Sequence, residues 1–212
     1  AGMLRLGLVT TADYFVPRLL EPFCSRYPGI DVRLEVTNRE RLLGRLLDNL
    51  DDLYVFGQNP ESQDVTQYPL EQNPLVVIAA PSHRLASEKN IPLETLVDEP
   101  FISREPGSGT RRTLSEHFGR YGFTPRIHME LASTEAIKQA VAAGLGISVL
   151  SQHTLEGEDR LTVLDVERFP IQRMWYIAHR KGKRLNVVAD AFLTHCRQFR
   201  VHRVSGPMRR IA

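Results

Sequence analysis

The chain has 212 residues, and its 42% hydrophobic and 25% charged residues are the composition of an ordinary soluble globular protein. The formal net charge is +2, and no apolar run reaches the length of a membrane-spanning helix. No secretory signal is recognisable, and Cys24 and Cys196 stand in no metal-like or redox-like spacing. We expect both to be reduced thiols of a cytoplasmic protein, with a disulfide as the open alternative.

Basic residues gather at the C-terminal end. Residues 172–212 hold ten Lys and Arg and one acidic residue, Asp190, whereas the first 171 residues carry an excess of acidic groups. A basic end could face nucleic acid. A solvated helix followed by a frayed tail explains the same bias, and we favour that interpretation.

The first half of the chain alternates strand and helix patterns. Val16, Leu19 and Phe23 follow helical spacing, and Pro28-Gly29 is a typical separator of a helix from a strand. Thr37 with Glu40 fits a capping box at the start of the second helix. The expected elements are a strand at 4–9, a helix at 14–27, a strand at 32–36, a helix at 39–50 and a strand at 52–56.

The second half repeats this scheme. Its strands are apolar throughout, which favours parallel sheets covered on both faces. The expected elements are a strand at 75–80, a short helix at 93–97, a strand at 101–103, a helix at 110–121, a strand at 127–131, a helix at 134–143 and a strand at 147–150. In the turn at 143–146, Gly144 or Gly146 would serve as a helix C-cap.

The remaining segment returns to the first half. We expect a pair of strands at 161–166 and 174–178, followed by a helix at 186–199 that packs against the first half. The chain then crosses between subdomains twice, near 72–75 and 169–172. The sequence therefore predicts an α/β fold of two Rossmann-like subdomains. Subdomain I would comprise residues 1–73 and 171–204, subdomain II residues 74–170, and a tail residues 205–212.

Hydroxyl or small polar residues follow a short apolar run at four places, and a helix pattern comes next. The four stretches are LRLGLVTTA (4–12), VRLEVTNRE (32–40), FISREPGSGT (101–110) and HMELASTEA (128–136). If the strands are parallel, the helix N-termini gather at the carboxyl edges of the sheets, where backbone N–H groups and helix dipoles favour an anion. The junctions predict a site for a small anionic metabolite.

The glycine-rich loop REPGSGTR (104–111) is the sharpest local signal. Its glycines would let backbone N–H groups approach an anion, and Arg104 or Arg111 could add positive charge. A plain strand-to-helix turn explains the loop as well. The pairs Thr10-Thr11 and Ser133-Thr134 would likewise cap helices with or without a ligand, and Arg39 is expected to be a solvated first-turn residue.

Signals for catalysis and metal binding are weak. The sequence contains neither a Gly-x-Ser-x-Gly elbow nor a His-Glu-x-x-His motif, and its seven histidines lack metal-binding spacing. We therefore expect a protein that is not an enzyme and holds no metal or cofactor.

The wording of the motifs resembles the effector-binding domain of LysR-type transcriptional regulators and, among these, the regulators of Calvin-cycle (RuBisCO) operons. The resembling stretches are YFVPRLLEPF (14–23), VTNRERLL (36–43), DDLYVFGQNP (51–60), NPLVVIAAP (73–81), REPGSGTR (104–111), EAIKQAVAAGLGISVLS (135–151) and LTVLDVERFPI (161–171). The resemblance implies a fold like type 2 periplasmic binding proteins, with an effector in the cleft between subdomains.

Family contacts carry over to eight positions of this chain, and the implied effector is a phosphorylated sugar, a nucleotide or NADPH. The implied binding residues are Thr10, Thr11, Asn38, Gln58, Arg104, Thr110, Ser133 and Thr134. Of these, Thr11→Val or Ser133→Ala is expected to weaken the response to the effector.

The resemblance also implies partners. Two copies would pair antiparallel, with the first helix (17–27) against the partner's helix (110–121), and the full-length protein would be a tetramer. The family's winged helix-turn-helix does not occur in these residues, so promoter DNA would be bound only through that missing domain. A periplasmic solute-binding protein for a small anion is the alternative, and an enzyme that turns over a phosphate ester in the cleft is a weaker one.

Overall fold

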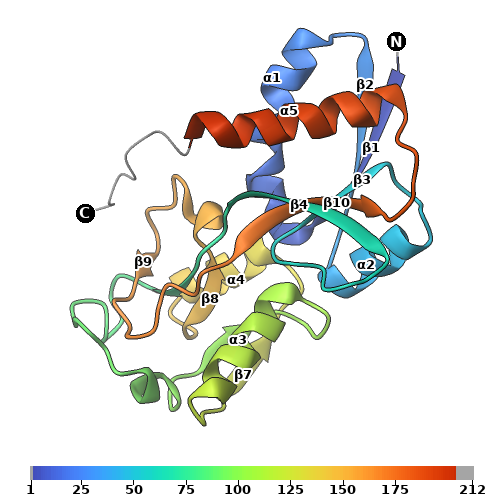
Figure 1. Ribbon diagram of the computed structural model, residues 1–212. Coiled ribbons are helices and arrows are strands. Elements are labelled where there is room, and N and C mark those ends of the chain that lie inside the picture. The colour runs from blue at the N-terminus through green and yellow to red at the C-terminus, as the bar shows by residue number, and fades with distance from the viewer. Residues whose placement is uncertain (1, 204–212) are drawn as a thin grey trace.

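The structure is a computed structural model that describes residues 2–203, with side chains up to residue 199. The predicted tail at 205–212 lies outside the described residues. Two α/β subdomains follow one another along the long axis of the molecule, and two chain segments join them (Figure 1).

Subdomain I is built on a five-stranded sheet whose first three strands are parallel. The order is β2 (Ile30–Thr37), β1 (Gly2–Val9), β3 (Leu53–Phe56), β10 (Met174–Arg180) and β4 (Val65–Gln72), and β10 runs antiparallel to both neighbours. The side chains of Leu4, Leu6 and Leu8 are fully buried in its core. The sheet thus exposes the carboxyl ends of β1, β2 and β3 at one edge.

Helices cover both faces of this sheet. Right-handed crossovers place consecutive helices of a βαβαβ unit on opposite faces when the chain reverses direction in the sheet. α1 (Val16–Arg26) packs beside α5 (Val187–Arg203), which runs across the sheet in Figure 1. α2 (Arg39–Leu47) lies on the other face, where Leu42 approaches Gly7 of β1. The predicted packing of the last helix against the first half is confirmed.

Subdomain II repeats the same plan. A parallel bridge between Phe101 and Ile147 joins its two groups of strands, so the order is β9 (Thr162–Val163), β5 (Leu75–Ala79), β8 (Ser148–Ser151), β6 (Phe101–Ser103) and β7 (Ile127–Glu130). The helices are η2 (Leu93–Leu96), α3 (Gly109–Arg120), α4 (Thr134–Ala142) and η3 (Gln152–Leu155). β6, β7 and β8 therefore correspond to β1, β2 and β3.

The two crossing segments lie side by side. Leu75 and Ile171 exchange backbone hydrogen bonds of 2.9 Å, and Asn73 N donates to the carbonyl of Arg173 over 2.7 Å. The fully buried Asn73 side chain donates to Gly57 O and accepts from Ser151 Oγ. We call these two hydrogen-bonded crossing segments the hinge.

Several expectations about the strands were wrong. β5 is apolar throughout because its alternate residues enter two hydrophobic clusters, but its neighbours β8 and β9 are antiparallel to it. The strand expected at 161–166 shortens to β9, which pairs with β5 and not with β10. β4 was not predicted, because its sequence VTQYPLEQ is largely half-buried and includes Pro69, as an edge strand can.

Two helix starts also differ from expectation. The Thr10-Thr11 pair begins the 3-10 helix η1 (Thr10–Tyr14) and α1 follows only at Val16, so neither threonine caps an α-helix. At α2 the cap is Asn38, whose side chain accepts from Arg41 N over 3.0 Å, and the Thr37–Glu40 capping box is wrong. Gly144 lies just after α4 with φ +79°, so the predicted glycine C-cap is confirmed there.

Candidate functional site

Three of the four strand-to-helix junctions meet at one cavity between the subdomains. Of the eight residues that the resemblance implied, six line it: Thr10, Thr11, Asn38, Gln58, Arg104 and Thr110. Its wall also contains Val9, Arg39, Phe56, Gly57, Ser108, Gly109 and Arg173. Residues from both halves of the chain thus converge where the helix N-termini were expected.

The fourth junction lies just outside this cavity. Ser133 is exposed and caps α4 by accepting from Ala136 N over 3.2 Å. Thr134 is buried, and its hydroxyl lies 3.5 Å from Arg104 Nη1. Neither residue belongs to the cavity wall, so Thr134 could reach a ligand only through Arg104 in this arrangement.

The cavity is small. Its volume is about 20 Å³, which is room for about one water molecule. Glu40 N donates to Gly107 O over 3.1 Å and Thr113 donates to Gln58, and both bonds join the subdomains. A ligand of several heavy atoms therefore requires the subdomains to separate or the lining side chains to turn.

Arg104 crosses the cleft. Its Nε and Nη2 pair with the Glu105 carboxylate at 2.9 Å, while Nη2 also approaches Thr10 Oγ1 of subdomain I at 3.4 Å. Arg104 is 4% exposed, so its guanidinium is nearly dehydrated. Arg111, the other arginine of the loop, donates to Arg104 O and pairs with Glu130, so the structure directs it away from the cavity wall.

Arg39 is buried, so the expectation of a solvated residue was wrong. Its Nη2 donates to the carbonyls of Asn59 and Pro60 at 3.1 and 2.9 Å. Burial, followed by the nearby Arg112 charge, lowers the pKa of Arg39. Gly109 makes this placement possible, since a Cβ there would lie 3.2 Å from Arg39 Cδ.

Arg173 is the residue that sequence reasoning missed. It follows the second crossing segment, and burial alone lowers the pKa of its guanidinium to about 9, which leaves it charged at neutral pH. Among the described residues it forms no ion pair, and its Nη2 has no hydrogen-bond partner. An arginine between two strands carries no local signal, because its burial depends on segments about 100 positions away.

A second, larger cavity adjoins the first. Its volume is about 330 Å³, and it lies between the exposed end of α3 and the start of β10. Gln58 and Arg173 belong to the walls of both cavities. The two spaces are therefore neighbouring compartments of one interdomain cleft.

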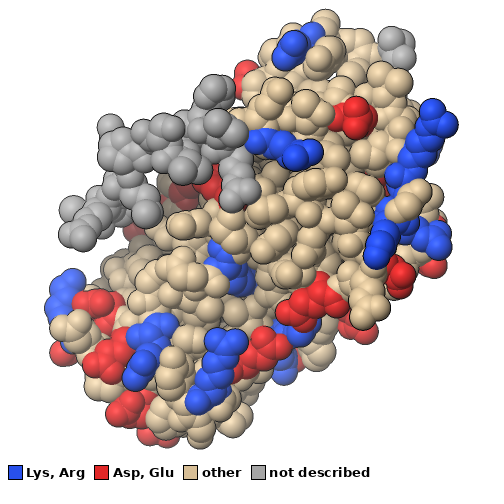
Figure 2. All heavy atoms as spheres, viewed as in Figure 1, with Lys and Arg blue, Asp and Glu red and all other residues tan. Residues whose placement is uncertain are grey.

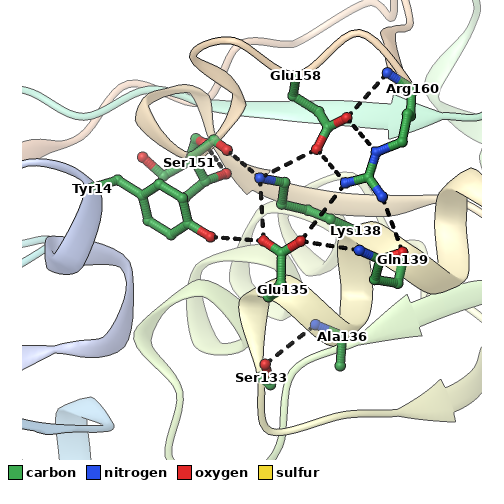
Figure 3. Close-up of polar contacts among 10 residues, drawn as sticks. Tyr14, Ser133, Glu135, Ala136, Lys138, Gln139, Ser151, Glu158 and Arg160 are labelled. Carbon is green, nitrogen blue, oxygen red and sulfur yellow. Dashed lines mark hydrogen bonds and ion pairs between the residues drawn. The ribbon is translucent and has the colours of Figure 1, made fainter.

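A second polar contact joins the subdomains on another side. Lys138 of α4 is 5% exposed, donates to Thr154 O over 2.9 Å, and lies between the carboxylates of Glu135 and Glu158 (Figure 3). Tyr14 of η1 reaches across, with its ring 5.1 Å from Lys138 Nζ. Because η1 also carries Thr10 and Thr11, this contact connects the cavity wall to α4.

Charges on the viewed surface are mixed in sign. Figure 2 shows Lys and Arg beside Asp and Glu over subdomain II, rather than a stripe of one sign. The groups of His, Cys, Asp and Glu within the described residues include none that could hold a metal ion. In the same part of the chain, no helix is long and apolar enough to cross a membrane.

Comparison with known proteins identifies the family. Residues 1–200 match the LysR substrate binding domain. The chain belongs to this family. It is 50% identical over 197 residues to the transcriptional activator CmpR of Synechocystis, which covers 92% of this chain and 65% of that protein. It is 47% identical over 194 residues to the RuBisCO operon transcriptional regulator of Allochromatium vinosum, covering 90% and 64% respectively.

Solved structures agree with the fold. The regulatory domain of CcmR from Synechocystis, solved in complex with 2-PG, superposes with a TM-score of 0.90 at 49% identity, covering 94% of this chain and 98% of that one. The effector-binding domain of QuiR, solved with shikimate, has a TM-score of 0.85 at 22% identity, covering 95% and 98%.

These comparisons confirm the predicted fold class and the resemblance to LysR-type regulators of carbon fixation. The chain spans slightly less than two thirds of the length of these curated relatives. Because the relatives are named as transcriptional regulators, the comparisons favour neither an enzyme nor a periplasmic solute-binding protein.

Proposed function

We propose that this chain is the effector-sensing domain of a LysR-type transcriptional regulator of carbon-fixation genes, and that its cleft binds a small phosphorylated anion. The observation that carries the proposal is the charge of the inner cavity. Arg39, Arg104 and Arg173 line it together with the N-terminal turns of α2 and α3, and its described lining contains no carboxylate. Guanidinium groups and free helix N–H groups are the donors that phosphate oxygens prefer.

Among phosphorylated anions, 2-phosphoglycolate is the first candidate, because the CcmR domain, at 49% identity, was solved with 2-PG. A ligand of this size fits the inner cavity only if the cleft opens, so binding would select one geometry of the two subdomains. The ligand shifts that equilibrium only by its difference in affinity for the two geometries. In the full-length protein, the shift would reach a DNA-binding domain and change promoter binding in the cytoplasm.

The division into subdomains follows from the hinge. We propose that subdomain I consists of residues 1–73 with 171–204, and subdomain II of residues 74–170, because the chain crosses beside Asn73 and beside Ile171. The effector would then contact both units, and hinge motion would be the response.

A dimer is part of the same proposal. Two copies would pair antiparallel through α1 of one copy and α3 of the other, and two such dimers would form the tetramer of the full-length protein. Exposed apolar side chains occur in both subdomains: Tyr27 follows α1, Leu34 and Val36 lie on edge strand β2, Tyr121 follows α3, and Ile127 begins β7. Large apolar groups on a surface favour such a contact.

A thermal-shift panel tests the effector site. It would compare 2-phosphoglycolate, ribulose bisphosphate, phosphoenolpyruvate, ATP and NADPH with glycolate, which lacks the phosphate. An effector at about 100 times its dissociation constant should stabilise the domain by roughly 2.7 kcal/mol. Failure of every phosphorylated compound to raise the melting temperature would contradict the proposal.

A substitution in the cavity wall tests whether the effector binds in the cleft. Thr11 is 4% exposed in the cavity wall, so Thr11→Val should weaken binding of the effector by about tenfold through the loss of one buried hydrogen bond, near 1.4 kcal/mol. Thr162→Val in β9, which lies outside both cavity walls, is the matched control and should leave the affinity unchanged.

A further inference from the structure

Arg173 is a buried cation with unused donors. Its side chain is 9% exposed, and its one hydrogen bond among the described residues is a long one, from Nε to Asn73 O at 3.4 Å. The other two arginines of the inner cavity are better satisfied. Arg39 donates to two carbonyls, and Arg104 forms a two-pronged ion pair with Glu105. Arg39 keeps one unpaired donor, Nε, whereas Arg173 has a free Nη2 and only one long hydrogen bond, so among the described residues it is the least satisfied guanidinium of the inner cavity.

Arg173 lies where the two compartments of the cleft meet. It belongs to the walls of both compartments, and Gly57 lies beside it, since a Cβ at Gly57 would be in ordinary van der Waals contact with Nη2 at 3.8 Å. A guanidinium presents five N–H donors in a planar fork, so it can bind oxygens on more than one side. An anionic oxygen between the two compartments would satisfy the donors that the protein leaves free.

Arg173 is also part of the hinge. Its carbonyl accepts from Asn73 N, and its Nε donates to Asn73 O, so both its backbone and its side chain hold the other crossing segment. A ligand on this guanidinium would pull directly on the residues about which the subdomains move.

We propose that Arg173 binds a second anionic group of the effector, so that the cleft selects ligands that carry a carboxylate or another oxyanion beyond the phosphate. This inference rests on the proposed function, because it assumes that the phosphate is bound by the inner cavity. The phosphate would occupy the donors around Thr11, Thr110 and Arg104, and the second group would lie toward the larger compartment. Arg173 would then be a specificity-determining residue.

Two ligands with similar skeletons test this selectivity. 2-Phosphoglycolate carries a phosphate and a carboxylate, whereas ethyl phosphate carries the phosphate alone. Isothermal titration calorimetry of the wild-type domain should show at least tenfold tighter binding of 2-phosphoglycolate. In Arg173→Met, which keeps the length of the side chain but not its charge, the two ligands should bind with affinities within about twofold of each other.

Arg111→Met is the matched control, because Arg111 lies in the glycine loop but is paired with Glu130. It should retain the wild-type preference. If Arg173→Met keeps the preference, or if wild-type protein binds both ligands equally, the inference is overturned while the proposed function stands. If wild-type protein binds neither these ligands nor any other phosphorylated anion of the panel, both fall.

A second variant and a structure cover the case in which Arg173→Met does not fold. Arg173→Lys keeps the charge without the fork and should reduce the preference for 2-phosphoglycolate without removing it. A crystal structure of wild-type protein with 2-phosphoglycolate should place a carboxylate oxygen within hydrogen-bond distance of the Arg173 guanidinium. A carboxylate bound elsewhere would overturn the inference.

Discussion

The hydroxyl of Tyr14 donates a hydrogen bond to the carboxylate of Glu135 over 3.2 Å, and this bond joins the two subdomains (Figure 3). Tyr14 ends the 3-10 helix whose first two residues, Thr10 and Thr11, line the inner cavity. Burial, followed by the charge of Glu135, raises the pKa of Tyr14 to about 12, so the hydroxyl remains a donor at physiological pH. The cleft and this contact are therefore expected to open together.

Removing the Tyr14 hydroxyl should loosen the closed arrangement. We expect Tyr14→Phe to lower the free energy of unfolding by about 0.5–1.5 kcal/mol, the net value of one hydrogen bond. Urea denaturation measures this change. Tyr68→Phe is the control, because the Tyr68 hydroxyl forms no hydrogen bond among the described residues. Equal stability of Tyr14→Phe and wild type would show that the bond does not hold the subdomains together.

Glu158 should make stability depend on pH in the acid range. Its hydrogen bond with Arg160, helped by the charge of Lys138, lowers the pKa of Glu158 to about 2, below the ordinary value of 4.5. A carboxyl whose pKa is lower in the folded state adds stability that is complete above about pH 4.5 and is lost as the pH falls toward 2. The side chain of Glu158 is 6% exposed but that of Arg160 is 44% exposed, so solvent screens the pair and the stabilisation is smaller than the full pKa shift would give.

Glu158→Gln should therefore lower the melting temperature at pH 7 by about 2–4 °C, equivalent to about 1 kcal/mol for a chain of this size. The difference from wild type should shrink between pH 4.5 and 2. Melting curves across this range measure it, with Glu88→Gln on the exposed surface as control. A difference that stays constant with pH would argue against the linkage.

Two glycine substitutions should change the free energy of unfolding in opposite directions. Gly107 has φ +90°, and a Cβ there would lie 2.6 Å from Glu40 Oε2, so Gly107→Ala should destabilise the protein by roughly 1–2 kcal/mol. Gly44 lies inside α2 with open space around it, so Gly44→Ala should stabilise by about 0.5–1 kcal/mol. Chemical denaturation of both variants gives the two signs, and a stabilised Gly107→Ala would contradict the expected strain.

The proposed dimer predicts an effect at Leu34. This side chain of edge strand β2 is 43% exposed, so Leu34→Glu should convert the dimer to a monomer at micromolar concentration in sedimentation velocity. Leu145→Glu is the control, because Leu145 is similarly exposed, at 47%, in the turn after α4. Wild-type protein that sediments as a monomer throughout that range would refute the dimer.

Local patterns were sufficient for most elements. α3 and α4 begin within one residue of their predicted starts, because Ser108 and Ser133 cap them through their own side chains. Caps and apolar periodicity act within a few residues, so they can be recognised in one dimension. The four junctions were recognised for the same reason, and three of them form the inner cavity.

Other features depended on partners far along the chain. β4 has little apolar pattern because an edge strand pairs with only one neighbour. β5 is buried between two hydrophobic clusters although it does not belong to a parallel sheet. Arg39 was expected on the surface, but it is buried because the carbonyls of residues 59 and 60 accept its hydrogen bonds. In each case the environment of the residue was decided by segments that approach only in the folded state.

The sequence by itself determined the family, the two α/β units and the small polar residues at the strand ends, because each of these features depends on residues that are close together in the sequence. Only the tertiary structure decided which junctions face one cavity, that this cavity is small, and that Arg173 is buried in its wall without an ion pair among the described residues. The physical reason is that desolvation of a charge depends on everything packed around it. Both subdomains contribute to that packing, so it cannot be inferred from either half of the sequence alone.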